Sequence, residues 1–338
     1  MSPYGHTKTL NYITMKKIFI AIAAFAAFAS CSNDEVVSIS REPITFGEAF
    51  VDNSTRAAID GSYSGTKKLT SFKVYGTVTG NSNTLTIYNG NDVVGKIGDA
   101  VWGCTGDEQY WISNCAYKFY AIADATSVSP TTGMPTTITY NENTTANGDL
   151  IFATVEDTTN AQAVPSKGNP VKFTFQHLLS KAKFTFKKSE YSNKRYTYTV
   201  KNIKFTDAYK QGTYTISTGA WGSQSTTGEL LFGNLEGNIT TDNATTGLES
   251  ANECQFVPAT YTASNPLTIS FDVVMMLDGN ELSTVKHTKT FPAEGGADYT
   301  FAKGKAYGFE VTLGDNNVIK FTVDALQGWD SKTDISIP

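Results

Sequence analysis

Cysteine and histidine are common carriers of covalent and metal chemistry, and they are few in this sequence; carboxylate pairs for glycoside hydrolysis meet only in the fold, and the sequence leaves them open. The 338 residues contain four cysteines and three histidines. No Cys-x-x-Cys pair occurs and the histidines are scattered, so we predict no metal site and no cofactor. Cys254 with His177 or His287 could form a nucleophile and base, but neither spacing resembles a known protease. We therefore predict no catalytic residue, and we expect His177, beside two leucines, to be structural.

The cysteine nearest the start of the chain, Cys31, ends a segment that is typical of exported proteins. Two lysines precede an apolar run, residues 18–29, and a serine and Cys31 follow it. The run is shorter than the roughly 20 residues that a permanent membrane-spanning helix needs. Residues 28–31 resemble a lipobox, in which the cysteine receives a diacylglycerol. We predict that residues 1–30 are a signal peptide region, that translation starts at Met15, and that Cys31 is lipidated.

A short polar segment and the overall composition predict the location of the chain and its fold class. Residues 32–35 are polar and acidic and resemble the surface-export signals of Bacteroidales lipoproteins, so we expect an outer-membrane lipoprotein on the cell surface. The chain has 17 tyrosines and 20 phenylalanines, which favour strands over helices. Its formal net charge of -5 gives no electrostatic reason to bind nucleic acid. The predicted fold class is all-β.

Short alternating segments separated by Gly, Asn, Asp, Ser and Pro begin at about residue 44 and predict mainly antiparallel strands. The best strand candidates are residues 72–78, 171–176, 183–186, 267–273 and 307–313. Asp278-Gly279-Asn280 is typical of a hairpin turn. The predicted division is a lipidated segment over 31–56, an N-terminal β-sandwich domain over 57–168 and a C-terminal β-sandwich domain over 169–338.

The remaining chemistry-bearing residues between 100 and 120 leave alternatives open. Cys104 and Cys115 are close enough in sequence to pair across a hairpin in an oxidising compartment, and the sequence does not decide whether this disulfide forms. Trp102, Tyr110 and Trp111 belong to the densest aromatic cluster. These rings either fill a core or form an exposed platform that stacks on sugar rings.

Several short segments together resemble the fimbrillin family of type V pilus subunits. Tyr110-Trp111 and residues 117–121 resemble core strands of its N-terminal domain, and residues 175–181 resemble the opening of its second domain. Residues 256–258 and 307–329 also fit. The resemblance implies two transthyretin-like β-sandwich domains and no enzymatic activity.

The resemblance also implies an assembly chemistry. A lipidated precursor reaches the outer membrane, a trypsin-like protease cuts after an arginine, and release of the N-terminal strand leaves a groove that a strand of another subunit fills. Arg56, followed by Ala57, lies in a polar, loop-like segment and is the preferred cleavage residue. Cutting at Arg41 would detach the lipid without freeing the groove. Residues 44–50 are the predicted leaving strand, with Glu48 as the one polar residue on its apolar face.

The predicted donor strand is residues 318–325, which alternate cleanly between apolar and polar side chains. Its apolar face consists of Ile319, Phe321, Val323 and Ala325. The alternative is that these residues form the last strand of their own domain.

The predicted function is therefore a structural subunit of a cell-surface fimbria that serves adhesion and polymerises by β-strand exchange. Its expected partners are other fimbrial subunits, the outer membrane through the lipid anchor, and a host surface or glycan ligand. The alternative is a surface glycan-binding lipoprotein that does not polymerise. Stalk, anchor and tip roles all remain open.

Overall fold

The structure is a computed structural model, and it describes residues 39–51, 62–64, 67–68, 71–80, 83–97, 101–112, 115–123, 127–129, 133–142, 149–157, 170–292, 296–315 and 319–326. Every regular element in these ranges is a β-strand, which confirms the predicted all-β class. The same ranges contain no helix of the length and apolarity needed to cross a membrane. The predicted signal peptide, Cys31, Arg56 and Ala57 lie outside the described residues.

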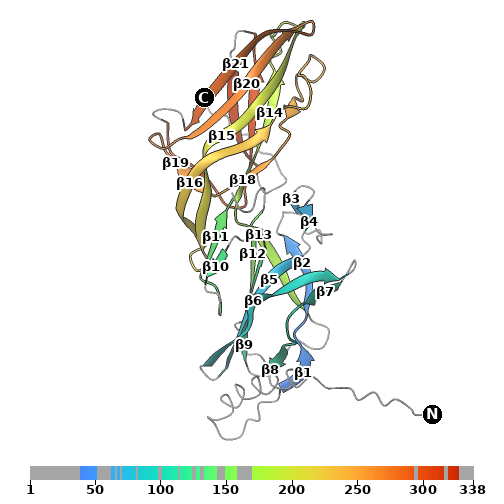
Figure 1. Ribbon diagram of the computed structural model, residues 1–338, viewed down its shortest axis with the longest axis vertical. Coiled ribbons are helices and arrows are strands. Elements are labelled where there is room, and N and C mark those ends of the chain that lie inside the picture. Colours follow the sequence, from blue (N-terminus) through green and yellow to red (C-terminus); the bar gives the residue numbers. More distant parts are fainter. Residues whose placement is uncertain are drawn as a thin grey trace, which may run out of the picture.

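A seven-stranded sheet forms one end of the elongated molecule (Figure 1). In spatial order its strands are β2 (Phe46–Val51), β13 (Val171–His177), β12 (Ile151–Asp157), β9 (Ala116–Ala123), β5 (Ser71–Gly80), β6 (Asn83–Ile97) and β7 (Val101–Cys104). Neighbouring strands are antiparallel except β2 and β13, which run parallel. Strands β2 and β7, at the two ends of this order, contact each other, so the sheet curls around one core.

Two sheets form the other end of the molecule. One consists of β10 (Ser127–Ser129), β11 (Thr137–Asn141), β15 (Tyr196–Thr215), β20 (Leu267–Leu277) and β21 (Asn280–Phe291), with β16 (Ala220–Gly233) also paired to β15. The other consists of β17 (Leu248–Glu249), β14 (Ser180–Lys188), β23 (Ala306–Leu313) and β24 (Ile319–Leu326), with β18 (Cys254–Phe256) also paired to β14. Phe186 of β14 meets Phe271 of β20 at a ring-centroid distance of 5.1 Å. The two sheets therefore share one core, as in a sandwich.

Three short strand pairs complete the described elements. They are β1 (Ile39–Pro43) with β8 (Tyr110–Ile112), β3 (Ser62–Ser64) with β4 (Lys67–Lys68), and β19 (Ala259–Tyr261) with β22 (Tyr299–Phe301).

The strands form where the sequence alternates. Along β13, buried and exposed residues alternate without interruption, so one face packs in the core and the other meets solvent. The predicted hairpin turn is also present, because Leu277 of β20 pairs with Asn280 of β21. Asp278 and Gly279 between them have φ values of 48° and 85°, the left-handed backbone that a two-residue hairpin loop with a type I′ turn requires.

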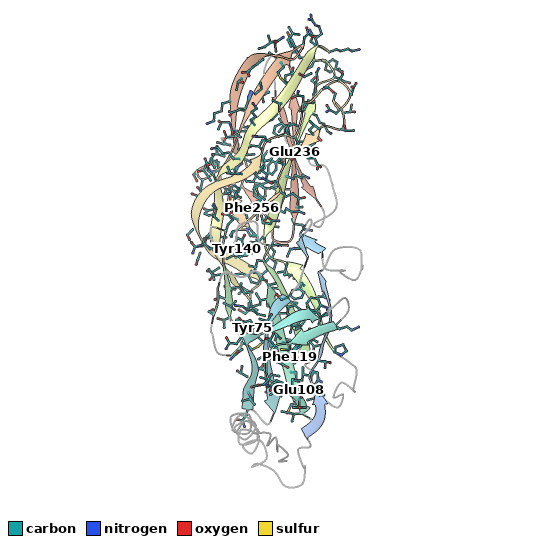
Figure 2. All side chains as sticks on the ribbon, turned by 45° about the vertical axis from the view of Figure 1, so that its right-hand side comes forward. Tyr75, Glu108, Phe119, Tyr140, Glu236 and Phe256 are labelled. Carbon is teal, nitrogen blue, oxygen red and sulfur yellow. The ribbon has the colours of Figure 1, made fainter. Side chains whose placement is uncertain are left out.

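The two ends of the molecule meet at a third cluster of buried residues. Its members come from both parts of the chain: Tyr75, Tyr120, Ile122, Ile138, Tyr140, Leu150, Phe152, Leu178, Leu179, Tyr214 and Val257. Trp221 packs against this cluster and donates its indole N–H to the Leu178 carbonyl at 2.7 Å. Figure 2 shows labelled Tyr140 between Tyr75 on one side and Phe256 on the other. A packed joint therefore connects the two ends.

The sheets divide the chain less simply than a single boundary near residue 168. β13 follows that position but pairs with β12 and β2 in the seven-stranded sheet, and the chain enters the five-stranded sheet only at Ser180. β11 precedes residue 168 but pairs with β15. The pairings of β2 with β13 and of β11 with β15 join residues far apart in sequence, so local composition around 168 carries no information about them.

Candidate functional site

Strand β2 is an edge strand of the seven-stranded sheet, and β13 is its partner in the ladder. Phe46 pairs with Val171, whereas Ala49 pairs with Phe173, so β2 uses three steps where β13 uses two. One extra residue in one strand is a β-bulge, which disrupts the ladder locally. The bulge changes the predicted face of this strand. The register places Ala49 and Val51, and not Glu48 and Phe50, opposite the buried Phe173 and Phe175.

The side chain of Phe46 anchors β2 in the core and is 5% exposed. Its ring lies 5.4 Å from Tyr88, 6.3 Å from Phe119 and 6.0 Å from Phe173, measured between centroids. Edge-to-face and stacked ring pairs of this kind contribute roughly 0.5–1.5 kcal/mol each beyond area burial. We call the space enclosed by these three rings the Phe46 pocket. Phe119 is labelled within this part of the molecule in Figure 2.

Besides the ladder with β13, further main-chain hydrogen bonds hold the segment around β2. The Ile44 amide donates to the Gln109 carbonyl at 2.7 Å, and the Val171 amide donates to the Thr45 carbonyl at 2.8 Å. Because an edge strand has a ladder on one side only, detaching β2 opens the edge of β13 and leaves the rest of the sheet paired. The arrangement therefore allows β2 to leave without dismantling the other strands.

The chain contains three arginines, and the structure distinguishes them. Arg41 lies inside β1, whose backbone pairs with β8. Arg195 lies in a turn in which its amide bonds to the Asn193 side chain and its guanidinium pairs with Asp278. Arg56 follows the last residue of β2, Val51, by five positions and lies outside the described residues. Both described arginines are thus held within folded backbone.

The predicted donor strand is β24, and it occupies the edge of the five-stranded sheet. It pairs with β23 through eight consecutive antiparallel positions without a register shift. The register sets the four predicted donor residues opposite four buried residues of β23: Ile319 with Leu313, Phe321 with Val311, Val323 with Phe309, and Ala325 with Tyr307. β24 thus completes its own sheet in the monomer, as the alternative interpretation of this strand expected.

A buried polar network that the sequence analysis missed lies just before β24. Lys188 is 4% exposed and donates to the carbonyls of Asn193 and Tyr196 at 2.9 and 2.6 Å. Asp315 accepts from the Asn193 amide at 2.6 Å and from the Tyr198 hydroxyl at 2.8 Å. Burial alone would raise the pKa of Asp315, but these hydrogen bonds and the charge of Lys188 lower it. The carboxylate therefore fixes the chain between β23 and β24 to the 189–195 turn.

The aromatic residues proposed as a glycan platform do not share an exposed surface. Trp111 is 5% exposed and packs against Tyr117, with 4.7 Å between ring centroids. Trp102 is half-buried and lies 5.4 Å from Phe72. Tyr110 is exposed, and its hydroxyl donates to Glu108. Trp111 and Trp102 pack in or against the core, as the alternative interpretation of these rings expected.

The cysteine pair predicted as an optional disulfide is not bonded in the structure. Cys115 is a buried free thiol. Cys104 ends β7 and Cys115 precedes β9, and β5 and β6 stand between these two strands in the sheet. The two cysteines do not face each other across a hairpin. The strand that lies between them in sequence, β8, pairs with β1 instead. Whether oxidation joins them stays a prediction.

The residues considered for catalysis have structural surroundings. Burial raises the pKa of Cys254 to about 12, and its thiol contacts the Leu231 carbonyl, so it is a poor nucleophile. His177 hydrogen-bonds through Nδ1 to Asp149, and both side chains are buried beside the joint. Burial lowers the pKa of His287, whose ring stacks on Phe271. In the part of the chain that the structure describes, no three His, Cys, Asp or Glu residues are grouped as a metal site.

A family model described as fimbrillin-like matches residues 55–326 of this chain. The chain belongs to the fimbrillin-like family. A search of curated protein sequences finds no match. Membership implies a fimbrial role at the cell surface and assembly with other fimbrial subunits, and this family is one of structural proteins.

Solved structures show that the fold of this fimbrillin-like chain is shared. A fimbrial protein from Bacteroides vulgatus superimposes with a TM-score of 0.60 at 19% sequence identity, covering 86% of this chain and 100% of that one. A proposed cell adhesion protein from Bacteroides uniformis gives 0.50 at 16% identity, with 85% and 98% covered. One from Bacteroides ovatus gives 0.50 at 14% identity, with 89% and 99% covered. At these identities the likeness is one of fold.

Proposed function

We propose that this chain is a subunit of a surface fimbria that is exported as a lipoprotein through Cys31, cut between Arg56 and Ala57, and polymerised by β-strand exchange. The observation that carries the proposal is the position of β2. It is an edge strand, it precedes Arg56 directly in the sequence, and it covers an aromatic core. Cutting after Arg56 separates β2 from everything that follows, so that only noncovalent contacts hold it.

The position of β24 supports the second half of the proposal. β24 is the last described strand and lies at a sheet edge, so its departure interrupts one ladder. A strand added to the open edge of β13 would be held by main-chain hydrogen bonds and by side chains in the former place of β2. Each buried side chain of the added strand contributes roughly 1.5–3 kcal/mol before ordering costs. Several of them suffice for a stable polymer.

Proteolysis of the purified chain tests the proposal. Incubation of the chain beginning at residue 31 with an Arg-specific protease should remove residues 31–56 and yield a ladder of oligomers on electrophoresis without heating. Arg56→Gln should stay monomeric, and Arg195→Gln, the matched control, should form the same ladder. Equal oligomerisation of the Arg56→Gln variant would show that processing at this position is not required.

Deletion of residues 317–338 tests the donor strand separately. A folded monomer that is cut normally but forms no ladder supports the donor role. Loss of the folded state, measured by circular dichroism, supports a purely structural β24. Undiminished oligomerisation contradicts the donor role outright.

A further inference from the structure

We propose that Phe321 of a second copy of this chain takes the place of Phe46 in the Phe46 pocket, and that the incoming β24 pairs with β13 without a bulge. This inference rests on the proposed strand exchange and specifies its register. It identifies the surface, the anchor residue and the partner strand.

The first supporting observation is a short pattern shared by the two strands. Ile44-Thr45-Phe46 begins the leaving strand, and Ile319-Lys320-Phe321 begins the donor strand. In both, an isoleucine stands two positions before a phenylalanine, which places the two on the same face of an extended strand. Ile44 and Phe46 are 6% and 5% exposed, so the leaving strand shows where this pair of side chains is buried.

The second observation is the poor fit of the leaving strand beyond Phe46. Gly47, which follows Phe46 at the register shift, lies against Pro170, and a Cβ at Gly47 would lie 2.5 Å from the Pro170 Cγ. Glycine avoids this overlap, whereas Thr322 of the donor strand, which follows Phe321, requires the Pro170 ring to move when it takes this position. The bulge also costs the strand regular ladder bonds at this point. β2 therefore pairs with Phe173 and Phe175 of β13 only after an irregular step in register.

The donor strand needs no such shift in register. β24 already pairs over eight positions with β23 without a register shift, so its backbone is that of a regular strand. With Phe321 opposite Val171, two regular steps place Val323 opposite Phe173, and two more place Ala325 opposite Phe175. In the leaving strand, Ala49 and Val51 hold the positions opposite the same two residues. A second copy thus offers an unbroken apolar face where β2 offers an interrupted one.

A second copy fits this edge better than the same chain does. β24 belongs to the five-stranded sheet, and Figure 1 shows β14 of that sheet at the end of the molecule away from β2. The joint between the two ends is packed, with Leu178 and Leu179 both 0% exposed. The chain's own β24 is therefore held away from this edge, and the strand that fills it comes from a second copy.

Binding of synthetic peptides to the full chain cut after Arg56 tests the assignment. The fluorescent peptide of residues 317–327 should bind. Its Phe321→Ala version should bind at least about a hundredfold more weakly, because removal of a buried phenyl ring changes the dissociation constant by that factor. The Thr322→Ala peptide, altered on the opposite face, should change less than about threefold. A peptide with one glycine inserted after Thr322, which imitates the bulge, should bind at least about tenfold more weakly.

The outcomes separate this inference from the proposed function. Tight binding of the unaltered peptide that survives Phe321→Ala overturns the assignment of the Phe46 pocket and leaves strand exchange standing. Tight binding of the inserted peptide overturns the bulge-free register. Failure of the unaltered peptide to bind the cut chain contradicts strand exchange itself.

Discussion

Replacement of Phe46 by alanine should release the leaving strand without unfolding the molecule. The ring is almost fully buried and contacts three aromatic rings, so the loss falls within the roughly 3–5 kcal/mol that a core Phe→Ala change costs. Since β2 has one neighbour in the ladder, this cost acts on local detachment of β2. At about 1.4 kcal/mol per tenfold change, the equilibrium for detachment rises at least about a hundredfold.

Hydrogen exchange measured by mass spectrometry on the uncut chain tests this prediction. Amides of residues 46–51 should exchange at least about a hundredfold faster in Phe46→Ala, while those of β20 keep their rates. Phe186→Ala is the matched control because Phe186 is 0% exposed in the other core. That variant should lower the melting temperature without selectively exposing residues 46–51. Equal acceleration in all strands, or none in 46–51, would refute the view of β2 as an independently detachable strand.

Three further predictions concern other parts of the molecule. Because the folded-state pKa of Asp315 is lowered, its stabilisation is present above the ordinary aspartate value near 4 and is lost as the pH falls through the folded value. Asp315→Asn should therefore lower the melting temperature at pH 7, and the difference from wild type should shrink as the pH falls below the ordinary value. A difference that stays constant into strong acid would contradict the network. Cys254, with its raised pKa, should resist iodoacetamide in the native chain and react in denaturant; rapid native labelling would disprove its burial. Gly279→Ala should lower the free energy of unfolding, measured in urea, by roughly 1–2 kcal/mol, because Gly279 has φ of 85° and open space around it. The control Gly222→Ala, also in open space but without positive φ, should be near neutral. Equal effects of the two changes would show that the turn conformation is not the cause.

The sequence predicted those features that depend on near neighbours. Alternation located β13, β20 and β23, since burial of one face imposes a period of two on each strand. Asp278-Gly279 located the hairpin because this pair accepts left-handed backbone. The family resemblance, carried by short segments, is confirmed by the fimbrillin-like match.

The features that the sequence did not reveal depend on distant partners. The bulge in β2 is set by the register against β13, more than a hundred residues away, so alternation alone put Glu48 on the apolar face. The pairing of β11 with β15 is likewise non-local. No local pattern marks Lys188 as buried, because its carbonyl partners and Asp315 come together only in the fold.

If a neighbour's strand holds each processed chain in the polymer, the N-terminus of the assembled protein must lie after the leaving strand. Mass spectrometry of fimbriae purified from the cell surface should find chains that begin at Ala57 and lack residues 31–56. Assembled chains that retain an acylated Cys31 together with β2 would contradict strand exchange after processing.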